Sequence, residues 1–66
     1  MRVRTDEASD ALYIRLGEAA IVESEEVGPG VIRDFDGGGR VVGVEMLNVR
    51  QRLPGADLRR VEVEVA

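Results

Sequence analysis

The 66-residue chain has no cysteine, histidine, tryptophan or lysine, and Tyr13 and Phe35 are its two aromatic residues. Without cysteine it can form no disulfide, and without cysteine or histidine a structural zinc site lacks its usual ligands. The commonest general base and the thiol nucleophile are missing for the same reason, and no lysine is present to pair with a hydroxyl group. We therefore expect a protein that is not an enzyme and that carries no cofactor.

Long apolar runs are also missing. No segment approaches the roughly 20 apolar residues that cross a bilayer, and the first residues, Met1–Asp6, lack the apolar core of a signal peptide. A net charge of −4 argues against the basic surface that binds nucleic acid without sequence preference. These features predict a cytoplasmic protein whose partner is neither a membrane nor a nucleic acid.

The chain is long enough for a single domain, residues 1–66, with an ordinary globular composition of 44% hydrophobic and 33% charged residues. A domain of this size buries only about 60% of the surface that its unfolded chain exposes. Small domains usually add a disulfide, a metal or a partner subunit. Because the first two are missing here, we expect a homo-oligomer, with a dimer favoured, or an obligate partner protein.

Apolar and polar residues alternate along most of the chain, and helical periodicity is nearly absent. This pattern predicts a mainly β (α+β) fold: an antiparallel meander of five or six strands with one short helix near the C-terminus. The strands are expected around Val3 and over residues 11–16, 20–27, 31–35, 40–47 and 61–65.

A hairpin is the local feature that the sequence marks best. Asp36-Gly37 separates two strand-like runs, and glycine supplies the positive φ that a tight hairpin turn requires. Beyond the hairpin, Asn48 is expected to cap a short helix that continues to Leu53. Pro54-Gly55 then ends this helix.

Two segments indicate contact with another polypeptide. Val41–Met46 has apolar residues at both odd and even positions, which is typical of a strand buried on both faces. Val61–Val65 alternates valine with glutamate, so it is expected to form a final strand that either closes the sheet or adds to a neighbouring chain. Tyr13, expected on the face opposite Leu12 and Ile14, either anchors an interface or covers sheet surface. The candidate interface residues are Tyr13, Val42, Val44, Met46, Val61, Val63 and Val65.

Acidic residues offer a second hypothesis, a divalent-cation or small-ligand binding domain. The densest acidic cluster consists of Glu23, Glu25, Glu26, Asp34 and Asp36. Carboxylate oxygens suit Ca²⁺ or Mg²⁺. In the simpler interpretation Asp36 serves the hairpin turn and the glutamates pair with arginines across strands. Asp6 and Asp10 have the same two interpretations, a site at a loop or hydrogen bonding within a turn.

The sequence resembles the small bacterial and archaeal family known as domain of unknown function 2283 from about Met1 to Leu53. The resemblance is carried by Asp6, Asp10–Leu16 (DALYIRL), Glu25–Val27 (EEV), Gly30–Asp36 (GVIRDFD) and Gly39–Glu45 (GRVVGVE). Thr5 stands where the family usually has an aromatic residue, and Val49-Arg50 replaces a small Ala-Ser pair. The family has no established activity. Its members are often encoded beside a small protein with toxin-like features, so the resemblance implies a partner-binding, antitoxin-like role.

Overall fold

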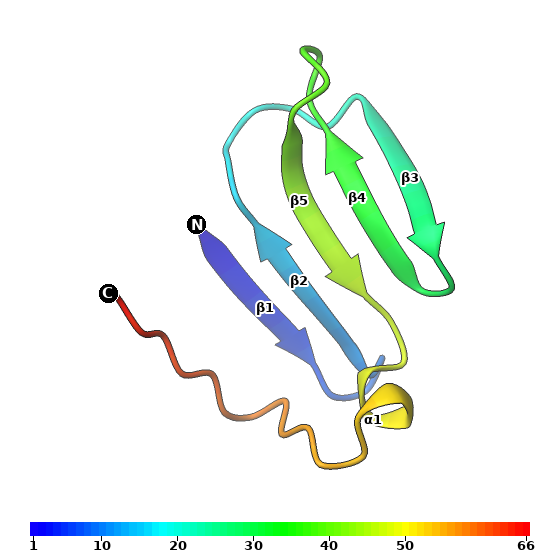
Figure 1. The fold of residues 1–66 in the computed structure, drawn as a ribbon, viewed down its shortest axis with the longest axis vertical. Helices are drawn as coiled ribbons and strands as arrows, with labels where there is room; N and C mark the ends of the chain where they lie inside the picture. Colours follow the sequence, from blue (N-terminus) through cyan, green and yellow to red (C-terminus); the bar gives the residue numbers. More distant parts are fainter.

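The computed structural model describes residues 1–66 and contains one sheet of five antiparallel strands (Figure 1). Its elements are β1 (Arg2–Asp6), β2 (Ala11–Arg15), β3 (Glu23–Gly28), β4 (Val31–Phe35), β5 (Val41–Met46) and α1 (Val49–Arg52). The prediction of a mainly β fold with one short helix near the C-terminus is confirmed.

The strand order corrects the predicted meander. The order is β1-β2-β5-β4-β3, so β2 pairs with β5 instead of with the next strand in the chain. Residues 16–22 carry the chain past the ends of β5 and β4 to the far edge (Figure 1). On the way, the Leu16 N–H donates to the Val42 carbonyl at 2.7 Å and the Val22 N–H donates to the Phe35 carbonyl at 2.8 Å. Residues 20–22, predicted as strand, belong to this crossing, and β3 therefore begins at Glu23.

The predicted hairpin is confirmed as β4 and β5 joined by Asp36–Arg40. The Asp36 carboxylate accepts the N–H groups of Gly38 and Arg40, each at 2.9 Å, and this holds the turn closed. Gly39 has φ 78°, a conformation that glycine adopts without steric cost. A bulge lies between Asp34 and Phe35 in the pairing with β5. Local turn chemistry and strand pairing thus agree in this part of the chain.

The helix forms, but Asn48 does not cap it as predicted. Asn48 has φ 55° and its side chain makes no capping hydrogen bond. Asp10, from the turn between β1 and β2, takes this role: its carbonyl accepts the Val49 N–H and its carboxylate accepts the Arg50 N–H, both at 3.0 Å. The start of α1 is therefore held by the β1–β2 turn, and the helix ends at Arg52, with Leu53 as its C-cap.

The predicted strand over 61–65 does not form within the single chain, so the sheet has five strands and not six. Residues 61–66 have no regular secondary structure, and none of their backbone groups forms a backbone hydrogen bond. The tail leaves the sheet beyond Leu58, whose carbonyl accepts the Thr5 hydroxyl at 2.6 Å (Figure 1). An alternating pattern can form a strand only where a neighbouring strand offers hydrogen-bond partners, and this segment is hydrogen-bonded to none.

The sheet has two chemically different faces. Strand register places on one side the residues that we call the apolar face: Val3, Leu12, Ile14, Val31, Val44 and Met46. The other side, the polar face, carries Arg2, Arg4, Tyr13, Ser24, Asp34, Gly43 and Glu45. The prediction that β5 is apolar on both faces is therefore wrong, because Gly43 and Glu45 face the polar side.

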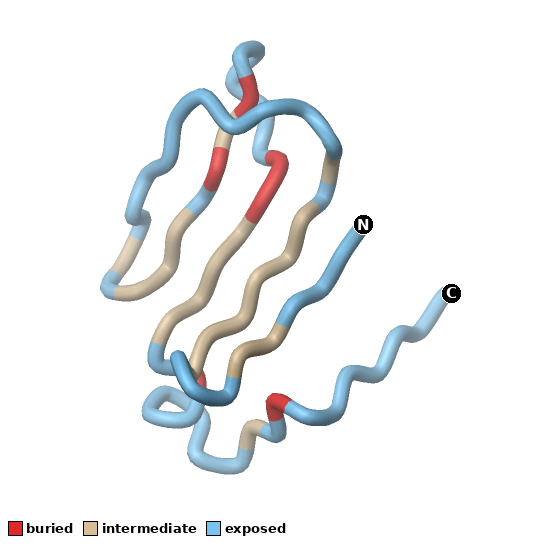
Figure 2. Tube along the Cα trace, turned by 180° about the vertical axis from the view of Figure 1, so that it is seen from behind, coloured by how far each residue is buried: buried red, intermediate tan, exposed pale blue.

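No second layer packs on either face. Six of the 66 residues are buried, and no large side chain is fully enclosed. The buried apolar residues are Val42, Val49 and Leu58, and buried positions lie at the two ends of the sheet, not at its centre (Figure 2). An isolated sheet normally packs its apolar side against another element. A single copy of this chain supplies only one turn of helix and a tail for that purpose.

Candidate functional site

The apolar face is the first candidate site, and its centre lies on β2 and β5. Leu12, Ile14, Val44 and Met46 are only half-buried, and Val3 on the edge strand is 42% exposed. On the β3 side this face becomes polar, because Glu25 and Arg33 lie there and form an exposed ion pair of 3.8 Å. The result is an open apolar patch with a charged margin.

The exposed area of the molecule is large for its mass. The chain exposes 4991 Å², whereas a folded monomer of 7.2 kDa exposes about 4,100 Å² by the usual scaling with mass. The radius of gyration is 12.7 Å, against about 11 Å expected for a compact domain of this length. The surplus of about 900 Å² reflects the open sheet and the extended tail.

The candidate interface residues occupy four different environments. Val44 and Met46 lie on the apolar face, and Val42 is buried, with 6% of its surface exposed. Val61, Val63 and Val65 in the tail are 53%, 75% and 92% exposed. Tyr13 lies on the polar face, opposite Leu12 and Ile14 as predicted. The structure therefore does not bring these seven residues together into one patch.

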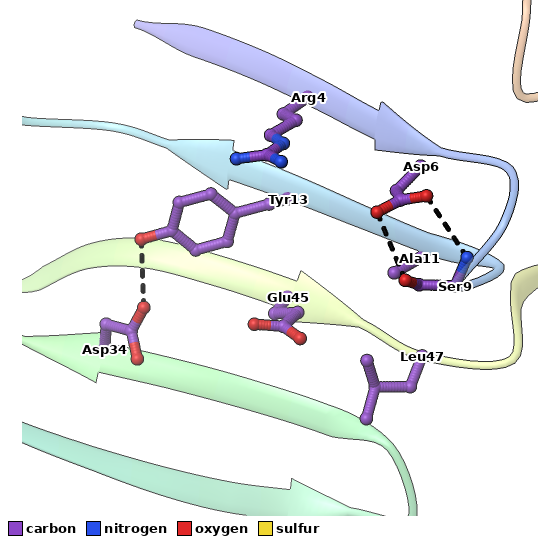
Figure 3. Close-up of a pocket in the computed structure, with 8 residues that line it drawn as sticks. All are labelled: Arg4, Asp6, Ser9, Ala11, Tyr13, Asp34, Glu45 and Leu47. Carbon is purple, nitrogen blue, oxygen red and sulfur yellow. Dashed lines mark hydrogen bonds between the residues drawn. The ribbon is translucent and has the colours of Figure 1, made fainter.

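Tyr13 belongs instead to a hydrogen-bond network across the polar face. Its hydroxyl reaches over β5 and donates to Asp34 on β4 at 3.0 Å (Figure 3), and Ser24 on β3 donates to the same carboxylate at 2.6 Å. Gly43 permits this crossing, because a Cβ there would lie 3.1 Å from both Tyr13 Cζ and Asp34 Oδ2. This network spans the four neighbouring strands β2, β5, β4 and β3. It provides hydrogen-bond donors to the carboxylate of Asp34, which is only 8% exposed.

An open hollow of about 600 Å³ lies beside this network on the polar face (Figure 3). Its lining residues are Arg4, Asp6, Ser9, Ala11, Tyr13, Asp34, Glu45 and Leu47. Neither Arg4 nor Glu45 takes part in an ion pair within the chain. The hollow therefore presents a guanidinium and a carboxylate that can form charge-assisted hydrogen bonds to a partner. The sequence interpretation did not single out Arg4, Gly43 or Ser24; a glycine inside a strand pattern was the available signal for close approach.

The acidic cluster does not assemble. Glu23 and Glu25 project to the side of the apolar face, whereas Glu26 and Asp34 project to the polar face, because successive residues of a strand alternate between faces. Asp36 is used by the hairpin turn, and no group of three or more carboxylates is placed to hold a metal ion. The interpretation of Asp36 as a turn residue is confirmed. The N–H groups of Arg40 and Gly38, with the Arg40 guanidinium, hold the pKa of Asp36 below its ordinary value against the opposing effect of desolvation.

Asp6 is used in local hydrogen bonding, which confirms the turn interpretation for this residue, whereas the Asp10 carboxylate bonds Arg50 at the start of α1, so the turn interpretation of Asp10 is wrong. Asp6 accepts the N–H and the hydroxyl of Ser9, each at 3.1 Å, and these bonds lower the pKa of Asp6. Asp10 accepts the Arg50 guanidinium at 2.8 Å as well as the Arg50 N–H, and both contacts lower the pKa of Asp10. These two carboxylates connect the β1–β2 turn to itself and to α1.

A family model described as "Protein of unknown function (DUF2283)" matches residues 2–50, which run from the start of β1 into α1. The match includes all five strands and the three residues of the hydrogen-bond network, Tyr13, Asp34 and Ser24. Comparison with curated proteins and with solved structures gives no match. No helix in the structure has the length and apolar character needed to span a membrane.

Proposed function

The chain belongs to the family described as "Protein of unknown function (DUF2283)", and we propose that it is a non-enzymatic protein–protein interaction module that works as a homodimer. In this dimer the apolar face of one copy packs on the apolar face of the other. The single observation that carries the proposal is the uncovered apolar face on β1, β2 and β5, with Ile14, Val44 and Met46 only half-buried.

The size of the open surface supports a second copy as the occupant. A stable interface buries about 800 Å² on each partner, which is close to the surplus of about 900 Å² that this chain exposes beyond a compact monomer of its mass. Two sheets pack face to face at about 10 Å and form one shared core. A two-fold axis would place each copy's apolar face against the same face of its partner. The Glu25 and Arg33 side chains would then lie at the margin of the contact, where charged residues are usual.

Light scattering and thermal melting test the dimer. The wild-type chain is expected to show twice its monomer mass of 7.2 kDa and a melting temperature that rises with protein concentration, since association stabilises the folded state. Val44→Asp places a charge at the centre of the apolar face and should abolish the dimer. Val22→Asp is the matched control, because Val22 lies outside the sheet and is 70% exposed. A folded wild-type monomer whose melting temperature does not depend on concentration would refute the proposal.

The polar face stays open in such a dimer, and we assign it to a second, different protein. The hollow beside Tyr13 offers Glu45 without an ion-pair partner in the chain, so a basic side chain of a partner protein can pair with it. In the antitoxin-like role that we propose, this partner is the product of a neighbouring gene. Co-expression of the two proteins should give a complex that Glu45→Arg weakens. If the two proteins do not co-purify, the antitoxin-like role is wrong and the homodimer is unaffected.

A further inference from the structure

We propose that residues 61–65 of one copy add to the β1 edge of the second copy as a sixth, antiparallel strand, with Val63 opposite Val3. This inference rests on the proposed homodimer and names a contact that holds it together. The tail would be exchanged between the two copies, each giving one strand and receiving one.

The tail has the features of a strand without a partner. Its valines at 61, 63 and 65 alternate with Glu62 and Glu64, which is the pattern of a strand with one face against apolar surface. Its valines are 53% to 92% exposed, and its backbone N–H and C=O groups form no backbone hydrogen bonds. A strand edge on another chain would satisfy these groups.

The sheet offers two edges, β1 and β3, and charge distinguishes them. Arg2 and Arg4 lie on the polar face of β1, and neither takes part in an ion pair within the chain. The β3 edge instead carries Glu23, Glu25 and Glu26. Opposite charges directly across a strand pair stabilise it, and like charges destabilise it. The acidic tail is therefore matched to β1 and repelled by β3.

The register follows from the same residues. With Val63 opposite Val3, Glu62 lies opposite Arg4 and Glu64 opposite Arg2. A slip of one residue would move the valines to the polar face. A slip of two residues in one direction leaves only one glutamate opposite an arginine. In the other direction the slip puts Glu62 opposite Asp6. One antiparallel register therefore satisfies both arginines and also places the valines beside the apolar face.

The start of the tail is held beside β1 of its own copy by side-chain contacts. Leu58 is 7% exposed and its carbonyl accepts the Thr5 hydroxyl at 2.6 Å, while Arg59 pairs with Glu7 at 3.0 Å. Continuing antiparallel from Leu58 opposite Thr5 would put Arg59 opposite Arg4 and would turn the valines to the polar face. Figure 1 shows the tail diverging from β1 beyond this anchor. The exposed contact between Arg60 and Glu62 is a surface ion pair and is readily exchanged.

Cysteine crosslinking of the full chain tests the contact, since the native sequence has no cysteine. The double variant Val3→Cys/Val63→Cys should form covalent dimers on mild oxidation, because opposite residues in a strand pair lie within disulfide reach. The matched control Val27→Cys/Val63→Cys probes the β3 edge and should stay unlinked. A covalent monomer would mean that the tail pairs with its own β1, and no crosslink would mean that the register is wrong; either result overturns the inference.

Charge reversal provides a second measurement that does not depend on disulfide geometry. Arg2→Glu/Arg4→Glu should raise the dimer dissociation constant by about tenfold or more, and adding Glu62→Arg/Glu64→Arg should restore it. Glu26→Arg, on the polar face of the other edge, is the control and should leave it unchanged. If the wild-type chain is dimeric but either the crosslink or the charge rescue is missing, the tail inference fails and the proposed homodimer stands. A monomeric wild-type chain would refute both the tail inference and the proposed homodimer.

Discussion

Replacing Gly43 by alanine tests how tightly the polar face is packed. At an unstrained position inside a strand, alanine is usually more stable than glycine by roughly 0.5–1 kcal/mol. At position 43 we expect the opposite sign, because the new Cβ would lie 3.1 Å from both Tyr13 Cζ and Asp34 Oδ2. Tyr13 would have to move off β5, and its hydrogen bond to Asp34 would be lost.

Two costs decide the magnitude. Overpacking a fitted site costs about 1–3 kcal/mol, and the loss of one hydrogen bond to a buried carboxylate adds about 1–2 kcal/mol. After the usual advantage of alanine is subtracted, Gly43→Ala should destabilise the fold by about 1–4 kcal/mol, with about 2.5 kcal/mol as the middle of this range. In a domain this small such a loss lowers the melting temperature by roughly 10–20 °C.

Thermal and urea unfolding at one fixed protein concentration measure the effect, so that association contributes equally to each variant. Gly28→Ala is the matched control, because no atom lies within 4 Å of a Cβ built at Gly28 and its φ is not in the left-handed region. The control should be neutral or slightly stabilising. Tyr13→Phe in the Gly43→Ala background removes the hydroxyl that a Cβ would displace, so the double variant should lose less than the sum of the two single losses.

A Gly43→Ala variant as stable as Gly28→Ala would refute this account of the polar face, since it would mean that Tyr13 does not cross β5 at Gly43. Strict additivity of Tyr13→Phe and Gly43→Ala would have the same meaning, because residues in contact show an interaction energy.

Two further predictions concern the carboxylates in turns. The pKa of Asp36 is lower in the folded chain than its ordinary value of 3.8, so its contribution to stability should be full above that value and lost as pH falls through the lower folded pKa; acid unfolding of Asp36→Asn should show a shallower loss in this range. Asp10→Ala removes the acceptor for the Arg50 N–H and guanidinium, and hydrogen exchange at Val49–Arg52 should become faster while exchange in β4 is unchanged. Unaltered exchange at the helix would contradict the anchoring role of Asp10.

Local features of the fold could be predicted from the sequence, whereas the strand order could not. The β4–β5 hairpin was predictable because Asp36-Gly37 and the flanking alternation act within a few residues of one another. The pairing of β2 with β5 depends on residues 16–22 bonding to Val42 and Phe35, which are distant in the sequence. Asn48 was a reasonable cap by residue type, but the cap came from Asp10, which is 38 positions earlier in the chain.

The candidate site shows the same limit. Alternation correctly placed Tyr13 opposite Leu12 and Ile14, but its partner Asp34 is on β4, one strand beyond the nearest neighbour. That contact could not be predicted before the strand order was known. Gly43 was a sequence signal for it, since glycine between Val42 and Val44 interrupts a β-branched run where a side chain from another strand crosses.

The tail is where the sequence pattern and the single chain disagree most. Val61–Val65 has the alternation of a strand, yet it pairs with nothing in one copy. A segment that is only exposed to solvent does not need strict alternation of valine and glutamate. Pairing with an edge strand that carries Arg2 and Arg4 explains the alternation, because it places the glutamates opposite the arginines. In the same copy the Leu58 carbonyl is held by the Thr5 hydroxyl, and a strand that continued from this contact would not have Val63 opposite Val3. The alternation of valine and glutamate in residues 61–65 needs a partner strand. Because the tail does not pair with β1 of its own copy, β1 of a second copy is the edge that we propose for it.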